Sequence, residues 1–126
     1  MLNTSKLVGF VGTSRPAEAM RFYEQSLGLK LLEESPFALV FLSGDTTVRI
    51  QKVQSVAAPP YTSLGWEVTD IAAAVRSLVS KGVVFQHYEG LPQDEAGIWR
   101  TPDGSRVAWF RDPDGNTLSL TEHAAK

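Results

Sequence analysis

The sequence has no cysteine, no long apolar run and no excess of positive charge. Without cysteine, the 126-residue chain can form no disulfide and has neither a thiolate nucleophile nor a thiolate metal ligand. No apolar stretch reaches the roughly 18 residues that a membrane-spanning helix needs, and the first residues show no signal-peptide pattern. The net charge of −2 argues against binding to a nucleic-acid backbone. We therefore expect a cytoplasmic protein without a membrane or nucleic-acid partner.

The chain instead contains one pattern twice. Each copy begins with an apolar strand, continues through a helix that a glycine ends, and then returns to strands. The helix starts at Arg15 and Asp70 lie 55 residues apart, and the closing glycines, Gly28 and Gly82, lie 54 apart. A linker with two prolines at 57–60 separates the copies. The length predicts a single domain over 1–126, with modules at 6–56 and 61–123.

Periodicity and turn residues predict the elements of each module. In the first, we expect a strand at 7–11, a helix from Pro16 to Leu27, and strands near 29–34, 37–43 and 46–53. In the second, we expect a strand at 62–68, a helix from Asp70 to Gly82, and strands near 83–88, 105–111 and 117–122. The stretch 89–104 is rich in Gly, Pro and Asp, which predicts an irregular binding loop.

Three short motifs resemble those of one superfamily. The Phe22-Tyr23 pair, Leu27-Gly28-Leu29 and the turn at 112–116, in this order and spacing, resemble the vicinal oxygen chelate superfamily of glyoxalase I, bleomycin-resistance proteins and extradiol dioxygenases. The resemblance covers nearly the whole chain. It implies an α+β fold in which two βαβββ modules form a curved mixed sheet around a shared cleft. It also implies a homodimer, since many members are dimers.

In glyoxalase-like members, four cleft positions hold a divalent metal through His, Glu or Gln. The resemblance places these positions at Val8, at Arg49 or Gln51, at Ser63 and at Ser119; loop length leaves the choice between Arg49 and Gln51 open. Val8 cannot ligate a metal, and neutral serines are poor ligands. We therefore expect no metal at these positions and no cofactor, with a divalent metal bound in some other way as the less favoured alternative.

Two groupings of histidine with carboxylates are the alternative metal positions. His87 accompanies Gln93-Asp94-Glu95 in the irregular loop, and Glu122-His123 lies near the C-terminus. A metal site needs three or more convergent ligands, so we favour surface positions for both.

Strand alternation predicts which polar side chains face the cleft. The residues that alternate with those expected to pack on the helices would form the floor of the ligand-binding cleft. These candidate ligand-binding residues are Arg49, Gln51, Ser63, Glu67 and Ser119. Arg49 would hold an anionic or carbonyl group, and Glu67 would bind a cation or act as a base. In the alternative interpretation, Arg49 and Glu67 pair with each other or lie at a solvated rim.

Aromatic side chains form a second candidate group. Trp99 in the irregular loop, Tyr88 before it and Trp109 after it would form a wall that stacks a planar or cationic ligand. In the alternative interpretation, Trp66 and Trp109 are core or dimer-interface residues, and Trp99 lies at the ligand or the dimer interface. The strand phase of Trp66 predicts that it packs against the helix.

Three functions are consistent with this pattern. The favoured hypothesis is a metal-free protein that binds a small molecule in its cleft, as bleomycin-resistance proteins do. The alternative is an enzyme of the same superfamily, a lyase, isomerase or dioxygenase, with a non-standard or metal-free site. The third is a dimeric scaffold or regulatory subunit with an empty cleft.

Overall fold

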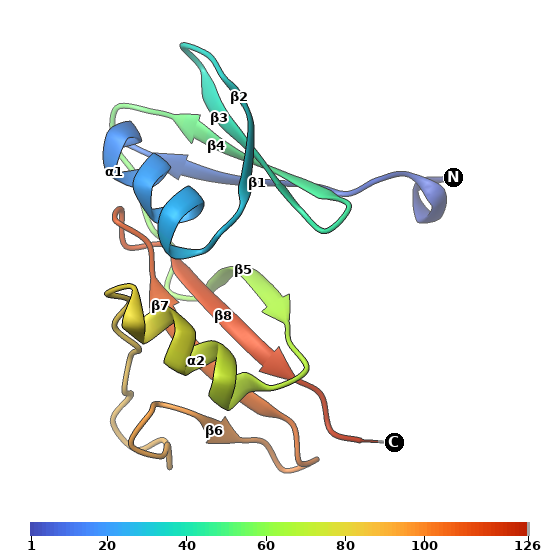
Figure 1. Ribbon diagram of the computed structural model, residues 1–126, viewed down its shortest axis with the longest axis vertical. Coiled ribbons are helices and arrows are strands. Elements are labelled where there is room, and N and C mark those ends of the chain that lie inside the picture. Colours follow the sequence, from blue (N-terminus) through green and yellow to red (C-terminus); the bar gives the residue numbers. More distant parts are fainter. Residues whose placement is uncertain (126) are drawn as a thin grey trace. The chain divides into compact units, whose positions relative to one another are not determined.

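The computed structural model describes residues 1–125, which form two compact units that meet between Ala58 and Pro59. This boundary falls inside the predicted linker. Each unit contains one four-stranded mixed sheet, so the sequence repeat is also a repeat of structure (Figure 1).

The first unit contains a sheet in the order β1-β4-β3-β2. After a short 3-10 turn at Leu2–Thr4, its elements are β1 (Val8–Thr13), α1 (Pro16–Arg21), β2 (Lys30–Glu34), β3 (Ala38–Ser43) and β4 (Thr46–Lys52). β1 runs parallel to β4, whereas β3 pairs antiparallel with both β2 and β4. The order places the first and last strands of the module side by side.

The first helix covers one face of this sheet. Pro16 occupies its first turn, where a missing N–H costs no hydrogen bond. The α-helix ends at Arg21 and continues as a π-helical turn at Phe22–Ser26, so the predicted helix is one segment with two hydrogen-bond patterns. Tyr23 of this turn is fully buried, and its ring lies 5.9 Å from that of Phe41. The contact identifies the Phe41 side of the sheet as the core side.

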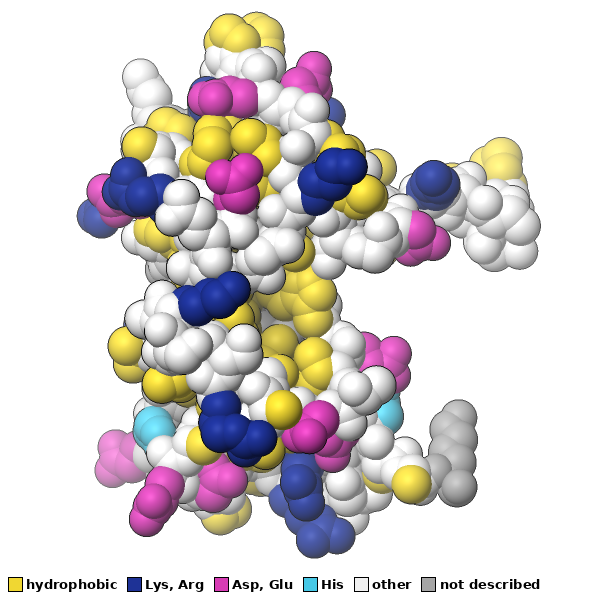
Figure 2. Space-filling model, viewed as in Figure 1, with side chains coloured by type: hydrophobic (Ala, Val, Ile, Leu, Met, Phe, Trp, Pro, Cys, Tyr) yellow, Lys and Arg dark blue, Asp and Glu magenta, His cyan; other side chains and the backbone are white. Residues whose placement is uncertain are grey.

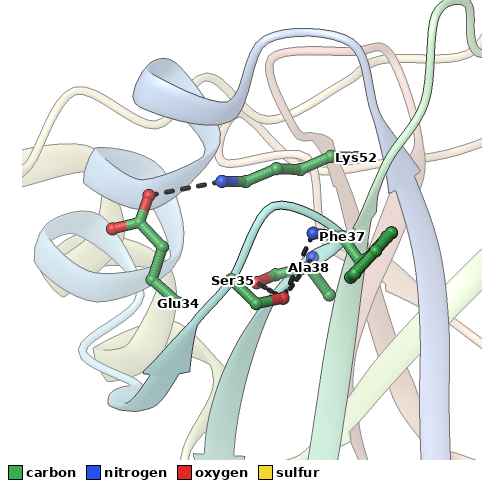
Figure 3. A network of polar contacts seen from close by, with 5 residues as sticks. All are labelled: Glu34, Ser35, Phe37, Ala38 and Lys52. Atoms are coloured by element: carbon green, nitrogen blue, oxygen red, sulfur yellow. Dashed lines mark hydrogen bonds and ion pairs between the residues drawn. The ribbon is translucent and has the colours of Figure 1, made fainter.

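The turn between β2 and β3 is fixed by a single hydroxyl (Figure 3). Ser35 Oγ accepts hydrogen bonds from the backbone N–H groups of Phe37 and Ala38 at 3.1 and 3.2 Å. Lys52 Nζ lies 3.3 Å from Glu34 Oε2 and so connects the end of β4 to the end of β2. The Phe37 side chain points away from these contacts and is 78% exposed.

The second unit repeats this arrangement in the order β5-β8-β7-β6. Its elements are β5 (Thr62–Glu67), α2 (Ile71–Ser80), β6 (Trp99–Arg100), β7 (Arg106–Arg111) and β8 (Thr117–Glu122). β5 runs parallel to β8, and β7 pairs antiparallel with β6 and β8. Figure 1 shows α2 lying across β7 and β8.

Two carboxylates hold the start of α2. The Asp70 side chain accepts a hydrogen bond from the N–H of Ala73 at 3.0 Å, which confirms the predicted N-cap. Glu122 of β8 accepts from the N–H of Ile71 at 3.0 Å and so joins the helix to the sheet. Below α2, the ring of Trp66 stacks on Phe110 at 6.4 Å. Trp66 therefore lies on the helix side of its sheet, as its strand phase predicts.

Two predicted segments of the second unit are wrong. The expected strand at 83–88 is reduced to a single bridge between Phe85 and Phe110, and β6 forms inside the stretch expected to be irregular. Val83 and Phe85 are buried and Val84 is exposed, so the segment has the alternation of a strand without a continuous ladder. The edge strand that pairs with β7 is instead β6, in which Trp99 lies opposite Val107.

No described helix is long and apolar enough to cross a membrane. On the face of each unit visible in Figure 2, basic and acidic side chains are interspersed. This face therefore presents no continuous basic surface in either unit.

Candidate ligand-binding site

Residues that lie opposite one another on neighbouring strands form rows across each sheet, and the rows of the two sheets can be compared. One row of the first sheet contains Phe10, Arg49 and Val40, and the corresponding row of the second contains Gly65, Ser119 and Trp109. Both rows lie on the side of the sheet opposite the helix, which we call the helix-free face. With the 55-residue spacing of the helix starts, Phe10 corresponds to Gly65, and Arg49, which lies opposite Phe10, then corresponds to Ser119.

Three aromatic side chains meet on the helix-free face of the second sheet. The rings of Trp99 and Trp109 stack with centroids 6.1 Å apart and planes 27° apart. Tyr88 meets Trp109 edge to face at 5.5 Å. Both tryptophans are partly buried and Tyr88 is exposed, so the group keeps apolar surface open to solvent. The structure thus brings together the residues of the predicted aromatic wall.

One glutamine braces the loop that carries Tyr88 to this cluster. Gln93 Nε2 donates hydrogen bonds to the carbonyls of Gln86 and Gly97 at 2.9 and 2.8 Å. Its Oε1 accepts from the N–H of Tyr88 at 2.6 Å. The amide therefore connects both ends of the loop 86–97 and fixes the backbone of Tyr88. Sequence reasoning missed this role, because the local pattern gives no sign of which backbone groups the amide reaches.

Ser119 lies beside Trp109 in the same row and is largely buried. A Cβ at Gly65 would lie only 2.8 Å from Ser119 Oγ, so glycine is needed for the hydroxyl to occupy this position. Within the described chain, this hydroxyl makes no hydrogen bond, and no fully buried polar side-chain atom lacks one. Ser119 Oγ is therefore accessible to solvent as a free donor and acceptor next to the tryptophan stack.

Glu67 lies at the end of β5, where its carboxylate meets a histidine of the same unit. His123 Nε2 is 3.4 Å from Glu67 Oε1. Both partners are exposed, so the pair contributes little to stability. They border a hollow of about 410 Å³ whose wall also includes Asp103, Ser105, Ala124 and Ala125. Glu67 is thus at the rim of the second sheet.

Hydroxyl and backbone donors surround the Asp103 carboxylate in the turn between β6 and β7. The Thr101 hydroxyl, followed by the backbone N–H of Ser105, donates to it and holds the pKa of Asp103 below its usual value of 3.8. Ser105 Oγ in turn accepts from the N–H of Ala124 at 3.1 Å. These contacts organise the turn and attach the C-terminal segment to it.

The remaining predicted residues are distributed between the units. Arg49 is partly buried on the helix-free face of the first sheet, and Gln51, opposite Gly12, is exposed. Ser63 lies at an irregularity near the start of β5, where the ladder passes from Thr62 directly to Leu64. In the second unit, the structure therefore brings Ser119, Trp99 and Trp109 together on one face, with Glu67 at its edge.

The two alternative metal groupings have other contacts. Asp94 Oδ1 accepts from the N–H groups of Ala96 and Ile98, both at 2.9 Å, and so closes a turn in the loop. Glu122 is bound to the start of α2, which leaves His123 with Glu67. Across residues 1–125, no three His, Asp or Glu side chains cluster closely enough to hold a metal ion.

Comparison with known families agrees with this architecture. A sequence model of the Glyoxalase/Bleomycin resistance protein/Dioxygenase superfamily matches residues 7–120. The chain belongs to this superfamily. The resemblance stated from three short motifs is therefore confirmed, as is the α+β fold of two mixed sheets. A comparison with curated proteins gives no match.

Several solved structures share the fold. A member from Sphaerobacter thermophilus is 21% identical, with a TM-score of 0.74, and the match covers 98% of this chain and 100% of that one. A lactoylglutathione lyase from Agrobacterium tumefaciens is 16% identical over 94% and 93% of the chains, with a TM-score of 0.73. TnmS3, an antibiotic-binding protein from Streptomyces sp. CB03234, is 23% identical over 98% and 99%, with a TM-score of 0.71.

The side chains at the four metal positions of the superfamily do not fit a divalent ion. Val8 has no donor atom, and Ser63 and Ser119 offer neutral hydroxyls. At the remaining position, the positive charge of Arg49 would repel the ion, and a single amide oxygen of Gln51 does not hold one. These positions therefore do not supply a set of ligands for a divalent ion.

Proposed function

We propose that the protein binds a small planar molecule against Trp99 and Trp109 on the helix-free face of its second sheet, without a metal and without turnover. The observation that carries this proposal is the stacked tryptophan pair, which keeps exposed apolar surface beside the free Ser119 hydroxyl. Aromatic faces favour offset stacking with planar molecules, and one nearby hydroxyl would orient the ligand by a hydrogen bond.

Two further observations support the proposal. Gln93 braces the loop of Tyr88, so the third aromatic wall is held before any ligand arrives and less order is lost on binding. TnmS3 shows that this scaffold serves an antibiotic-binding protein elsewhere. The superfamily also includes enzymes such as the Agrobacterium lyase, so fold alone does not choose between binding and catalysis.

Calorimetric titration with a neutral planar probe, acridone, tests the site. We expect Trp99→Leu and Trp109→Leu each to weaken binding by roughly 3- to 10-fold, since an aromatic contact contributes about 0.5–1.5 kcal/mol. Trp66→Phe is the matched control, because Trp66 lies on the helix side and should leave the affinity unchanged. Equal losses in all three variants, or none in the first two, would contradict the proposed position.

Two more measurements separate binding from catalysis. Dialysis against EDTA should leave acridone affinity unchanged if no metal takes part. Ligands that bind should be recovered chemically intact after long incubation, as judged by mass spectrometry. A modified product would instead favour the enzyme alternative.

A further inference from the structure

The helix-free face of the first sheet carries an arginine between apolar neighbours. Arg49 lies in the centre of β4, opposite Phe10 of β1 on one side and Val40 of β3 on the other. Phe10 is 55% exposed, and Val8, two residues earlier on the same face, is 41% exposed. A guanidinium is thus presented within apolar surface, part of which is open to solvent.

This arginine has no partner in its own unit. Within residues 1–58, the Arg49 side chain makes no hydrogen bond and no ion pair, whereas Arg15 pairs with Glu18 and Lys52 pairs with Glu34. Its nitrogens reach solvent, because no fully buried polar side-chain atom among the described residues lacks a hydrogen bond. Five N–H donors are therefore available on this face.

The nearest carboxylate in the same row does not reach it. Glu33 of β2 lies opposite Val40 and so stands two strands from Arg49, about 10 Å away at a strand spacing of about 4.8 Å. Lys30, on the same face opposite Leu42, adds a second cation rather than a counter-charge. The face has the charge and the free donors to receive an anion from outside the unit.

We propose that Arg49 and Phe10 form a binding subsite for the carboxylate of a small aromatic acid. A planar guanidinium matches a carboxylate through two parallel N–H···O bonds, and Phe10 offers apolar surface one strand away for the body of the acid. A single guanidinium among apolar residues suits one carboxylate better than a polyanion, which binding sites usually meet with several cations. The proposal concerns the first unit and stands independently of the aromatic site of the second.

Benzoate and its neutral analogue benzamide test the proposal on the full chain. Titration followed by amide NMR should show benzoate shifting the signals of β1 and β4, with benzamide binding at least about tenfold more weakly, as expected for charge-assisted hydrogen bonds. Arg49→Gln should abolish this preference for the anion, and Arg49→Lys should retain part of it. Arg21→Gln, which removes an exposed arginine of α1, is the control and should leave the preference intact.

The outcomes distinguish this subsite from the aromatic one. Loss of the anion preference in Arg49→Gln, with a dispersed spectrum and unchanged acridone binding, supports the subsite. Benzoate shifts confined to β7 and β8, equal affinity for benzoate and benzamide, or a preference that survives in Arg49→Gln would each overturn it. If Arg49→Gln fails to fold, the same titration is made with Arg49→Phe or Arg49→Met. An unchanged preference for benzoate in either folded variant would overturn the subsite, and loss of that preference would support it.

Discussion

At the residue scale, the candidate site depends on a few side chains with unusual surroundings. Gly65 leaves room for the Ser119 hydroxyl, and Gln93 uses both ends of its amide on the backbone of one loop. Arg49 shows the opposite situation, a guanidinium without any partner in its unit. Gly65 and Gln93 thus maintain the local structure, whereas the Arg49 guanidinium remains available to a ligand.

Gln93 should be important for both stability and binding. Gln93→Ala removes three hydrogen bonds to the backbone, two of them part-buried, and we expect a loss of about 1–3 kcal/mol in the free energy of unfolding. Acridone affinity should fall as well, because the loop that positions Tyr88 loses its brace. Urea denaturation and calorimetry measure the two effects.

Gln54→Ala provides the control for this variant, since Gln54 is exposed and makes no hydrogen bond among the described residues. It should change neither quantity. Unaltered stability in Gln93→Ala would show that the loop is held by its other contacts.

At the scale of secondary-structure elements, the two modules place their helices on the sheets by different means. The first helix begins at Pro16, passes into a π-helical turn and buries Tyr23. The second begins at the Asp70 cap and is attached to β8 through Glu122. The repeat therefore conserves topology without conserving the interactions that fix each helix.

The cap of α2 gives a prediction at this scale. Asp70→Ala leaves the N–H of Ala73 without its acceptor, and we expect a loss of about 0.5–2 kcal/mol in the free energy of unfolding. Thermal or urea unfolding measures the change.

Asp45→Ala is the comparison for Asp70→Ala, since Asp45 is exposed in the β3–β4 turn and its side chain makes no hydrogen bond within residues 1–125. If both variants lose the same stability, the effect belongs to the loss of a surface charge and not to the cap.

At the scale of the whole molecule, exposed apolar side chains favour association with a second copy. Several large ones lie on the surface of the first unit, among them Leu32 and Phe37. A patch of such residues commonly marks an interface. We expect a homodimer, in which a second copy would cover these side chains.

Light scattering coupled to gel filtration tests this expectation. The measured mass should be twice the 13.8 kDa of the chain and should fall towards the single-chain value on strong dilution. A mass of one chain at every concentration would contradict the homodimer.

Local sequence patterns were enough to predict the repeat, the superfamily and the side of the sheet on which most residues lie. These features follow from local rules: strand alternation placed Trp66 under the helix, and turn and cap residues placed Asp70 and Gly28 at helix ends. The apolar run Val83-Val84-Phe85 was misleading, because Val83 and Phe85 are buried with only a single bridge to the sheet and no continuous ladder.

Register and long-range partners emerged only from the folded chain. The fold places Arg49 opposite Phe10, pairs Glu67 with His123, and gives Gln93 and Glu122 their backbone contacts. Each of these depends on the distance between segments far apart in the chain, which no local pattern encodes. The physical reason is that a single hydrogen bond adds little to the local preference of a residue, whereas the packed sheets fix which groups can meet.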